Sequence, residues 1–277
     1  MTTWFWALGS RFSQPVALSR TQNRKPRPEF RVKLSAEMPH LNPHPNINWE
    51  RIDTVLLDMD GTLLDLHFDN YFWKRHVPQR FSEKHHMSLE QASEELFTRY
   101  GSVRGTMQWY SVDYWTEELG LDIASLKKEV DHLIVVHPHV VDFLKKTRLA
   151  GKRTVLVTNA HGKSLDLKMK RTQLGRHLDT LVCAHDLGIP KEEVSFWKKL
   201  EEVEFYLPDR TLLIDDNLEV LTSAQTYGIR YLLAVARPDT QGPESKKSNF
   251  DTLQSFDELA CSLELHYPPS ISKEEKQ

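Results

Sequence analysis

Five short apolar runs, rich in Val, Ile and Leu, recur along this chain and constrain its fold more than any other feature. They occupy residues 54–57, 154–157, 178–183, 211–214 and 231–235. Runs of this length and composition are typical of strands buried on both faces. Amphipathic helical stretches separate the later runs; Val140, Phe143 and Leu144, for example, fall on one helical face. The alternation predicts an α/β fold with a Rossmann-like parallel sheet between two layers of helices.

Residues 66–137 interrupt the alternation and predict an inserted all-helical cap. Helical patterns cover residues 71–80, 88–100, 107–119 and 123–133. Ser88 with Gln91 is typical of a capping box, and Gly120 of a helix stop. The predicted hydrolase core comprises residues 46–65 and 138–265, and residues 266–277 are expected to form a flexible tail.

The N-terminal part of the chain differs in composition from the rest. Residues 1–37 hold seven basic and two acidic side chains, and Pro39, Pro43 and Pro45 follow in a linker-like stretch. We expect residues 1–45 to be a disordered extension, or a spurious one if Met38 is the true start. A transit peptide is the weaker interpretation, because only the Arg-rich, acid-poor composition favours it.

Composition excludes several classes of protein and partner. The net charge is −3, which gives no overall basic field for nucleic acid. The sequence contains no apolar run of the roughly 18–20 residues that a membrane span needs. Two cysteines, Cys183 and Cys261, cannot build a disulfide framework and suit a reducing compartment. We therefore expect a cytoplasmic protein with no nucleic-acid or membrane partner, and the choice between monomer and dimer stays open.

The first apolar run leads directly into Asp58 and Asp60. In a parallel α/β sheet, ligands bind beyond the carboxyl ends of the strands. Two carboxylates two residues apart point the same way and repel each other unless a cation lies between them or one is protonated. Mg²⁺ fits this oxygen-rich arrangement. Gly61 then permits a sharp turn, and the N–H groups around Gly61 and Thr62 could hold an anion.

Polar residues also follow the later runs. Thr158 and Asn159 follow the second run, Asp215 and Asp216 follow the fourth, and Lys191 precedes a predicted helix. Together they bring carboxylates, a hydroxyl group and an ammonium group to one edge of the sheet.

Two other interpretations of the first motif fail. An EF-hand beginning at Asp58 needs Gly at its sixth position and Glu at its twelfth, where this chain has Leu63 and Asp69. An Asp-x-Asp glycosyltransferase would not predict the partner residues on the later runs.

These motifs resemble those of the haloacid dehalogenase superfamily over residues 50–240. Its four motifs are matched by Asp58-Met59-Asp60-Gly61-Thr62, by Thr158-Asn159, by Lys191 and by Asp215-Asp216. The helical insertion after the first motif resembles the first-type cap of that superfamily. An acid at the position of Asp60 marks its phosphatases rather than its dehalogenases.

The resemblance implies a role for each matched residue. Asp58 would be the nucleophile that forms an aspartyl-phosphate, and Asp60 the general acid and base. Thr158 and Lys191 would bind the transferring phosphoryl group, together with the loop around Gly61. Asn159 follows Thr158 and is a further phosphate-binding candidate. Mg²⁺ would be held by Asp58, by the backbone carbonyl of Asp60 and by Asp216. Asp215 and Glu219 remain alternatives for an additional acidic ligand.

A narrower resemblance is to the bacterial GMP/IMP nucleotidases of the same superfamily. It rests on residues 53–58, 68–73 and 228–231 together with Trp109-Tyr110 and Asp113-Tyr114-Trp115. It implies an Mg²⁺-dependent 5′-nucleotidase with a small purine nucleotide as substrate. A phosphatase of sugar phosphates or other small phosphoesters is the alternative with the same site. A phosphomutase would share every motif, and a non-catalytic binding module on the same fold is the alternative of another class.

Aromatic residues are frequent in the predicted cap. Most of them are expected to form the cap's own core. Stacking on a purine base is the second hypothesis for Phe68, Tyr71, Trp73 and Trp109. His161 follows the second motif and is expected either at the surface or behind the residues that contact substrate.

Overall fold

The core of the protein is a six-stranded parallel sheet. The computed structural model describes residues 47–244 and 248–267. The strands are β1 (Thr54–Leu57), β2 (Arg153–Thr158), β3 (Thr180–Cys183), β4 (Thr211–Asp215), β5 (Tyr231–Val235) and β6 (Asp251–Leu253). Their order across the sheet is β3-β2-β1-β4-β5-β6, and each neighbouring pair is parallel. Strands β2 and β3 are added on one side of β1, and β4, β5 and β6 then follow on the other side, so the strand order reverses between β1 and β4. This is where such sheets bind ligands.

Both faces of the sheet are covered, which explains why the central strand β1 is apolar throughout rather than alternating. In β1, Val55 and Leu57 pack into one hydrophobic cluster, whereas Leu56 packs into the other. All three side chains are buried. A strand buried on both faces has no polar side, so its sequence reads as a continuous apolar run.

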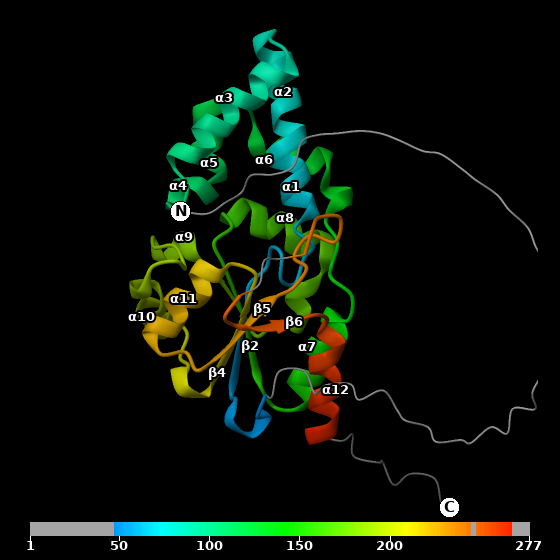
Figure 1. The fold of residues 1–277 in the computed structure, drawn as a ribbon, viewed down its shortest axis with the longest axis vertical. Helices are drawn as coiled ribbons and strands as arrows, with labels where there is room; N and C mark the ends of the chain where they lie inside the picture. The colour runs from blue at the N-terminus through cyan, green and yellow to red at the C-terminus, as the bar shows by residue number, and fades with distance from the viewer. Residues whose placement is uncertain (1–46, 245–247, 268–277) are drawn as a thin grey trace, which may run out of the picture. The chain divides into compact units, whose positions relative to one another are not determined.

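Helices cover the two faces as shown in Figure 1. One layer contains α9 (Ala184–Leu187), α10 (Val194–Val203) and α11 (Leu218–Tyr227); the other contains α7 (Val140–Leu149), α8 (Gly162–Thr172) and α12 (Phe256–His266). Short 3₁₀ helices lie at Trp49–Arg51, Leu174–His177 and Pro208–Arg210. The predicted fold class, a parallel Rossmann-like sheet with an inserted helical cap, is confirmed.

The segment between β1 and α7 is helical, and residues 66–137 are called the cap below. Its elements are α1 (His67–Tyr71), a π-helical segment (Phe72–His76), α2 (Val77–His85), α3 (Leu89–Ser102), α4 (Met107–Tyr110), α5 (Val112–Leu119), α6 (Ile123–Glu129) and a 3₁₀ turn (Asp131–Leu133). The capping box of Ser88 and Gln91 is present, and Gly120 ends α5 in the left-handed conformation. Ser111 divides the predicted helix of residues 107–119, because its hydroxyl group caps α5.

The first cap helix is longer than predicted and changes its pitch in the middle. Residues 67–85 are helical without a break, but the turn over Phe72–His76 is π-helical. Pro78 follows this turn and has no N–H to donate to the preceding turn. A wider local turn is the usual way for a helix to accommodate such a lost hydrogen bond.

One strand of the sheet departs from the sequence-based expectations. Strand β6 was not predicted, since a run of three residues carries too little pattern. Helix α8 ends at Thr172, and Gln173 after it adopts the left-handed conformation. The predicted extension of residues 1–45, with its linker, and most of the predicted tail lie outside the described residues. The domain boundaries stay a prediction.

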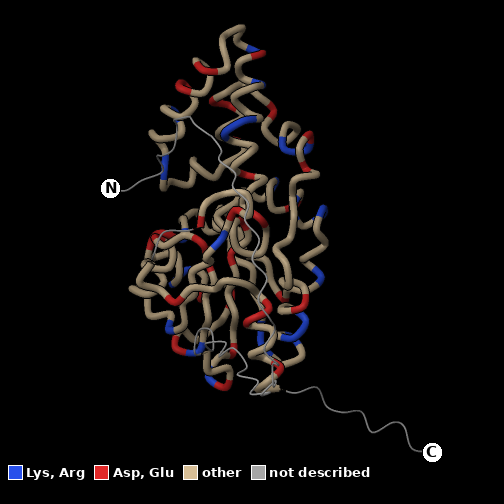
Figure 2. The backbone as a smooth tube through the Cα atoms, turned by 45° about the vertical axis from the view of Figure 1, so that its right-hand side comes forward, with Lys and Arg blue, Asp and Glu red and all other residues tan. Residues whose placement is uncertain are grey.

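Acidic and basic residues are interspersed along the chain. Figure 2 shows acidic and basic positions interspersed over the described residues. None of the helices in this part of the chain is both long and apolar enough to cross a membrane.

Candidate active site

Asp58 and Lys191 form the centre of the site. Asp58 follows the last residue of β1, and its N–H donates to the carbonyl of Ile214 in β4 (3.0 Å), which fixes it at the carboxyl edge of the sheet. Lys191 Nζ lies 2.5 Å from Asp58 Oδ1 and is only 2% exposed. The same ammonium group donates to Asp215 Oδ2 (2.7 Å) and to the carbonyl of Val157 (3.1 Å). Its three N–H groups are therefore used, and Lys191 bridges two carboxylates rather than presenting a free donor to a phosphate.

Asp58, Asp215 and Asp216 form an acidic cluster. One oxygen from each carboxylate lies within 4.8 Å of the others. Burial raises the pKa of Asp58 to about 6, and Asp215 adds to this rise while Lys191 opposes it. Burial, with the charges of Asp58 and Asp215, holds the pKa of Asp216 well above its usual range. Glu219 is exposed on α11, so Asp215 rather than Glu219 is the second acid beside Asp216.

The chemistry of this cluster fits Mg²⁺. Oxygen ligands of Mg²⁺ lie about 2.1 Å from the ion, so pairs of them lie roughly 3–4 Å apart. Three carboxylate oxygens within 4.8 Å of one another can reach that arrangement. Burial and the neighbouring carboxylates raise the pKa of Asp58 and of Asp216 although Lys191 opposes the rise, and a bound cation would favour the charged carboxylates.

Gly61 is required by the turn that follows Asp58. Its φ is +89°, and a Cβ atom there would lie 2.6 Å from Asp216 Oδ2. Its N–H donates to the carbonyl of Leu64 (2.7 Å), so it is not an open anion donor in this structure. Thr62 is fully buried, and its hydroxyl group has no hydrogen-bond partner among the described residues.

Asp60 is held on the other side of the turn by a second buried lysine. Lys168 Nζ, from α8, lies 2.6 Å from Asp60 Oδ1. Burial raises the pKa of Asp60 to about 6, although Lys168 opposes the rise. A carboxyl group with a pKa near neutrality can exchange a proton at physiological pH, as general acid–base catalysis requires.

Thr158 and Asn159 end β2 beside this centre. Thr158 is buried, and its hydroxyl oxygen accepts from the N–H of Ala160 (3.0 Å). Asn159 Oδ1 accepts from the N–H of Lys191 (2.9 Å), while its Nδ2 donates to Glu192 (2.8 Å). Asn159 therefore positions the loop that carries Lys191.

Glu192 connects this loop with the cap. Its Oε1 accepts hydrogen bonds from the hydroxyl group of Tyr110 (2.5 Å) and from Asn217 Nδ2 (3.0 Å). Tyr110 ends α4 in the cap, and burial next to Glu192 raises its pKa, which keeps the hydroxyl group a donor. Asp113 of α5 makes a second link to the core, through an ion pair with Lys163 of α8. His161 begins α8 as its N-cap and packs against His185.

The sequence patterns assigned no role in the site to Lys168, Glu192 or Tyr110, although Tyr110 belongs to the stretches that carry the nucleotidase resemblance. For Lys168 a signal exists, because it lies three residues after Leu165 on the buried face of α8 and interrupts the apolar pattern with a charge. Such a residue is rarely buried without a partner. The roles of Glu192 and Tyr110 depend on how the cap packs against the core, and no local sequence pattern predicts them.

The cap aromatics mostly pack against one another, as expected. Phe68 is 1% exposed and lies beneath two lysine ammonium groups. Trp73 and Trp109 are half-buried and make edge contacts with Tyr100. Tyr71 is the most exposed of the four stacking candidates, at 37%.

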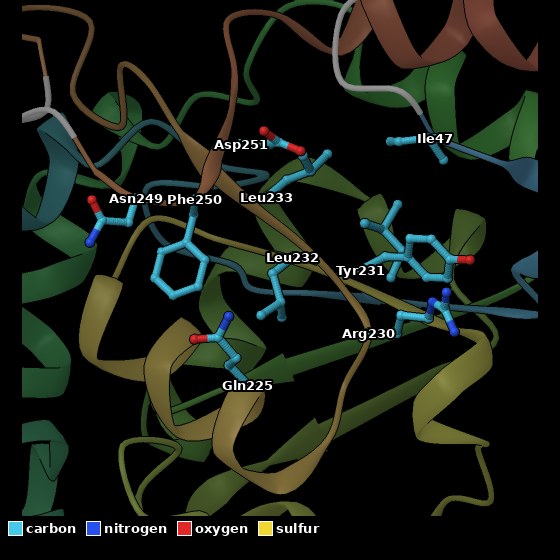
Figure 3. A pocket seen from close by; sticks show the side chains of 10 residues that line it. Ile47, Gln225, Arg230, Tyr231, Leu232, Leu233, Asn249, Phe250 and Asp251 are labelled. Carbon is cyan, nitrogen blue, oxygen red and sulfur yellow. The ribbon is translucent and has the colours of Figure 1, made fainter.

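A hollow of about 230 Å³ lies at the other end of the sheet (Figure 3). Phe250, Leu232 and Gln225 project into it, and none of the predicted site residues lines it. Leu212 and Tyr231, which also line it, pair near the beginnings of β4 and β5. The candidate site residues follow the ends of the strands, so this hollow is separate from them.

Comparison with known proteins identifies the family of the chain. The haloacid dehalogenase-like hydrolase family matches residues 52–228. The chain is 41% identical over 220 residues to the GMP/IMP nucleotidase YrfG of Escherichia coli (strain K12), covering 79% of this chain and 99% of that protein, and equally to YrfG of Shigella flexneri. A crystal structure of a HAD phosphatase from Thermococcus onnurineus superposes with a TM-score of 0.65 at 21% identity, over 76% of this chain and 98% of that one, and this likeness shows the fold alone. The chain belongs to the haloacid dehalogenase-like hydrolases and is a phosphoric monoester hydrolase of that family.

Proposed function

We propose that the protein hydrolyses the purine nucleoside 5′-monophosphates GMP and IMP in an Mg²⁺-dependent reaction that passes through an aspartyl-phosphate on Asp58. The observation that carries this proposal is the cluster of Asp58, Asp215 and Asp216 around Lys191, with Asp60 beside it. The substrate class is supported by the 41% identity to GMP/IMP nucleotidases over nearly their whole length.

The reaction uses Asp58 and Asp60 in two steps. A carboxylate oxygen of Asp58 attacks phosphorus, the bond from phosphorus to the ribose 5′-oxygen breaks, and Asp60 gives its proton to that oxygen. Water then attacks phosphorus, Asp60 takes up the proton of the water, and the carboxylate of Asp58 is released with inorganic phosphate. Covalent catalysis of this kind replaces one difficult displacement by two easier ones.

The other residues of the site hold the charges in place. Lys191 fixes one oxygen of Asp58 and so leaves the second for attack on phosphorus. Asp58, Asp216 and the carbonyl of Asp60 would hold Mg²⁺, with Asp215 beside them. When bound, the ion supplies a Lewis acid that offsets the charge of the phosphoryl oxygens. Thr158 and Asn159 would lie beside the bound phosphoryl group.

The cytoplasmic location, which was inferred from the two cysteines, stays a prediction.

A phosphate-release panel tests the proposal. With Mg²⁺, the protein should release phosphate from GMP and IMP faster than from sugar phosphates, and a chelator should stop the release. Asp58→Asn should abolish turnover, whereas Asp53→Asn, at the exposed opposite end of β1, should retain it. Faster release from sugar phosphates would favour the alternative substrate class, and near-normal turnover by Asp58→Asn would reject the covalent mechanism.

A further inference from the structure

Lys168 is a buried lysine at the site to which the proposed chemistry assigns no role. It is 1% exposed, and its Nζ lies 2.6 Å from Asp60 Oδ1 and 2.6 Å from Asp69 Oδ2. The same ammonium group lies 5.2 Å from the centre of the Phe68 ring. A charge removed from water in this way is stable only if its partners satisfy it. Lys168 therefore bridges the loop of Asp60 and the first cap helix.

The bridge continues into the cap. The second oxygen of Asp69 accepts from Lys127 Nζ (3.0 Å), and Lys127 is also buried, on α6. Four charges of alternating sign follow one another: Asp60, Lys168, Asp69 and Lys127. They come from the loop after β1, from α8, from α1 and from α6. Because Lys168 is paired on both sides, its Nζ is fixed between the core and the cap.

The contact with Asp60 restrains the carboxylate in a definite way. Within residues 47–244 and 248–267, Lys168 provides the hydrogen bond that holds the Asp60 side chain, and it does so at Oδ1. One held oxygen limits rotation of the carboxyl group and leaves Oδ2 available for proton exchange. Proton transfer needs heavy atoms within hydrogen-bond reach, so a carboxyl group free to rotate would transfer its proton less often.

We propose that Lys168 is a positioning residue for proton transfer to the leaving group: it acts through Asp60, and Asp69 holds it in place from the cap. The inference rests on the proposed function, in which Asp60 is the general acid. Lys168 does not touch the reacting atoms. A purely structural ion pair would instead stabilise the cap and core without affecting one chemical step more than another.

Leaving-group dependence separates the two roles. A nucleoside 5′-monophosphate has an alkoxide leaving group that needs a proton, whereas p-nitrophenyl phosphate has a good leaving group that needs little help. We compare kcat/KM, which reports the steps up to formation of the aspartyl-phosphate and excludes its hydrolysis. General acid catalysis typically contributes 10²–10⁴-fold. Lys168→Met should lower kcat/KM for GMP by about 10²-fold, and for p-nitrophenyl phosphate by a much smaller factor.

Lys127→Met is the matched control, because it removes a buried lysine from the same chain of charges without touching Asp60. It should lower the melting temperature and change kcat/KM for both substrates by similar factors. If Lys168→Met does not fold, Asp69→Asn takes its place: it keeps the shape but weakens the hold on Lys168, and it should show the same selectivity to a smaller degree.

Asp60→Asn distinguishes the failure of this inference from that of the proposed function. If Asp60→Asn shows the leaving-group dependence and Lys168→Met loses both substrates equally, Lys168 is only a structural ion pair and the inference is wrong. If Asp60→Asn itself lacks that dependence, Asp60 is not the general acid, and the proposed mechanism fails together with the assignment of Lys168.

Discussion

Tyr110 of the cap donates a hydrogen bond to Glu192 of the core, with 2.5 Å between the phenol oxygen and Glu192 Oε1. Glu192 is the neighbour of Lys191, so this bond joins the cap to the loop that organises the nucleophile. Hydrogen bonds to charged groups contribute about 1.5–3 kcal/mol to stability. The position of the cap over the site therefore depends partly on one hydroxyl group.

Removing that hydroxyl group should weaken substrate binding more than chemistry. For Tyr110→Phe we expect KM for GMP to rise about tenfold, as the loss of one such bond implies, with a smaller fall in kcat. Steady-state kinetics measure both values. Tyr114→Phe, also half-buried in the cap, is the control and should leave both nearly unchanged. A fall in kcat without a rise in KM would contradict a role in seating the cap.

Gly61 should not tolerate a side chain. Its left-handed φ costs an L-residue about 1 kcal/mol, and the added Cβ would lie 2.6 Å from the carboxylate of Asp216. Gly61→Ala should therefore lower the melting temperature and displace Asp216, with loss of most activity. Gly101→Ala is the control: it lies in α3 with open space around it and should stabilise the helix by about 0.5 kcal/mol. Full activity of Gly61→Ala would show that Asp216 can move without consequence.

Asp216 should contribute to the affinity for Mg²⁺, whereas Glu219 should not. Asp216→Asn removes a charged ligand from the acidic cluster, so the Mg²⁺ concentration for half-maximal activity should rise at least about 10-fold. Mutating residues that only hydrogen-bond to metal ligands already lowers metal affinity by about 10–100-fold, and loss of a ligand should cost no less. Thermal unfolding gives a second readout, because an ion that binds the folded protein raises the melting temperature. Glu219→Gln should match the unaltered protein in both measurements. Equal effects of the two substitutions would reject the assignment of the metal site.

Trp109 is a candidate for base stacking that the structure leaves accessible. It is half-buried and adjoins Tyr110, which reaches the loop of Lys191, whereas Phe68 is enclosed. Stacking on a base is worth about 1–3 kcal/mol. Trp109→Ala should therefore raise KM for GMP by at least about 5-fold more than KM for a base-free phosphate ester. Equal losses on both substrates would mean that Trp109 serves only the packing of the cap.

His137 should make the protein less stable in mild acid. Its Nε2 lies 3.2 Å from the carbonyl of Pro238, and burial lowers its pKa below the usual 6.5, although Asp65 and Asp239 oppose this. The unfolded chain therefore takes up a proton at a higher pH than the folded protein does. The contribution of neutral His137 to the free energy of unfolding is therefore fully present above about pH 6.5, and it is lost as the pH falls through the pKa of His137 in the folded state.

Thermal unfolding between pH 7.5 and 5.5 measures this effect. His137→Gln should make the fall in melting temperature shallower, whereas His132→Gln, at an exposed position, should leave it as it is. The fall should not vanish, because burial also lowers the pKa of His161, His177 and His185. An unchanged pH profile for His137→Gln would mean that protonation of His137 does not contribute to the loss of stability.

The sequence by itself determined the sheet and the chemistry at its edge. Buried parallel strands need continuous apolar runs, so β1 to β5 were visible as local patterns, and the polar residues that follow them had to meet at one edge. Asp58, Thr158 and Asp215 were found in this way. Their neighbourhood was predictable because a strand end is a local feature and parallel strands align their ends.

Only the tertiary structure decided what surrounds those residues. Lys168 meets Asp60 across 108 positions of sequence, and Tyr110 meets Glu192 across 82. These contacts depend on how α8 is rotated against the sheet and on how the cap packs on the core. Both are set by the sum of many weak side-chain contacts rather than by a local motif. A charged residue within the apolar pattern of α8 indicates that Lys168 is buried and needs a partner of opposite charge. Which residues are its partners is determined only by the tertiary structure.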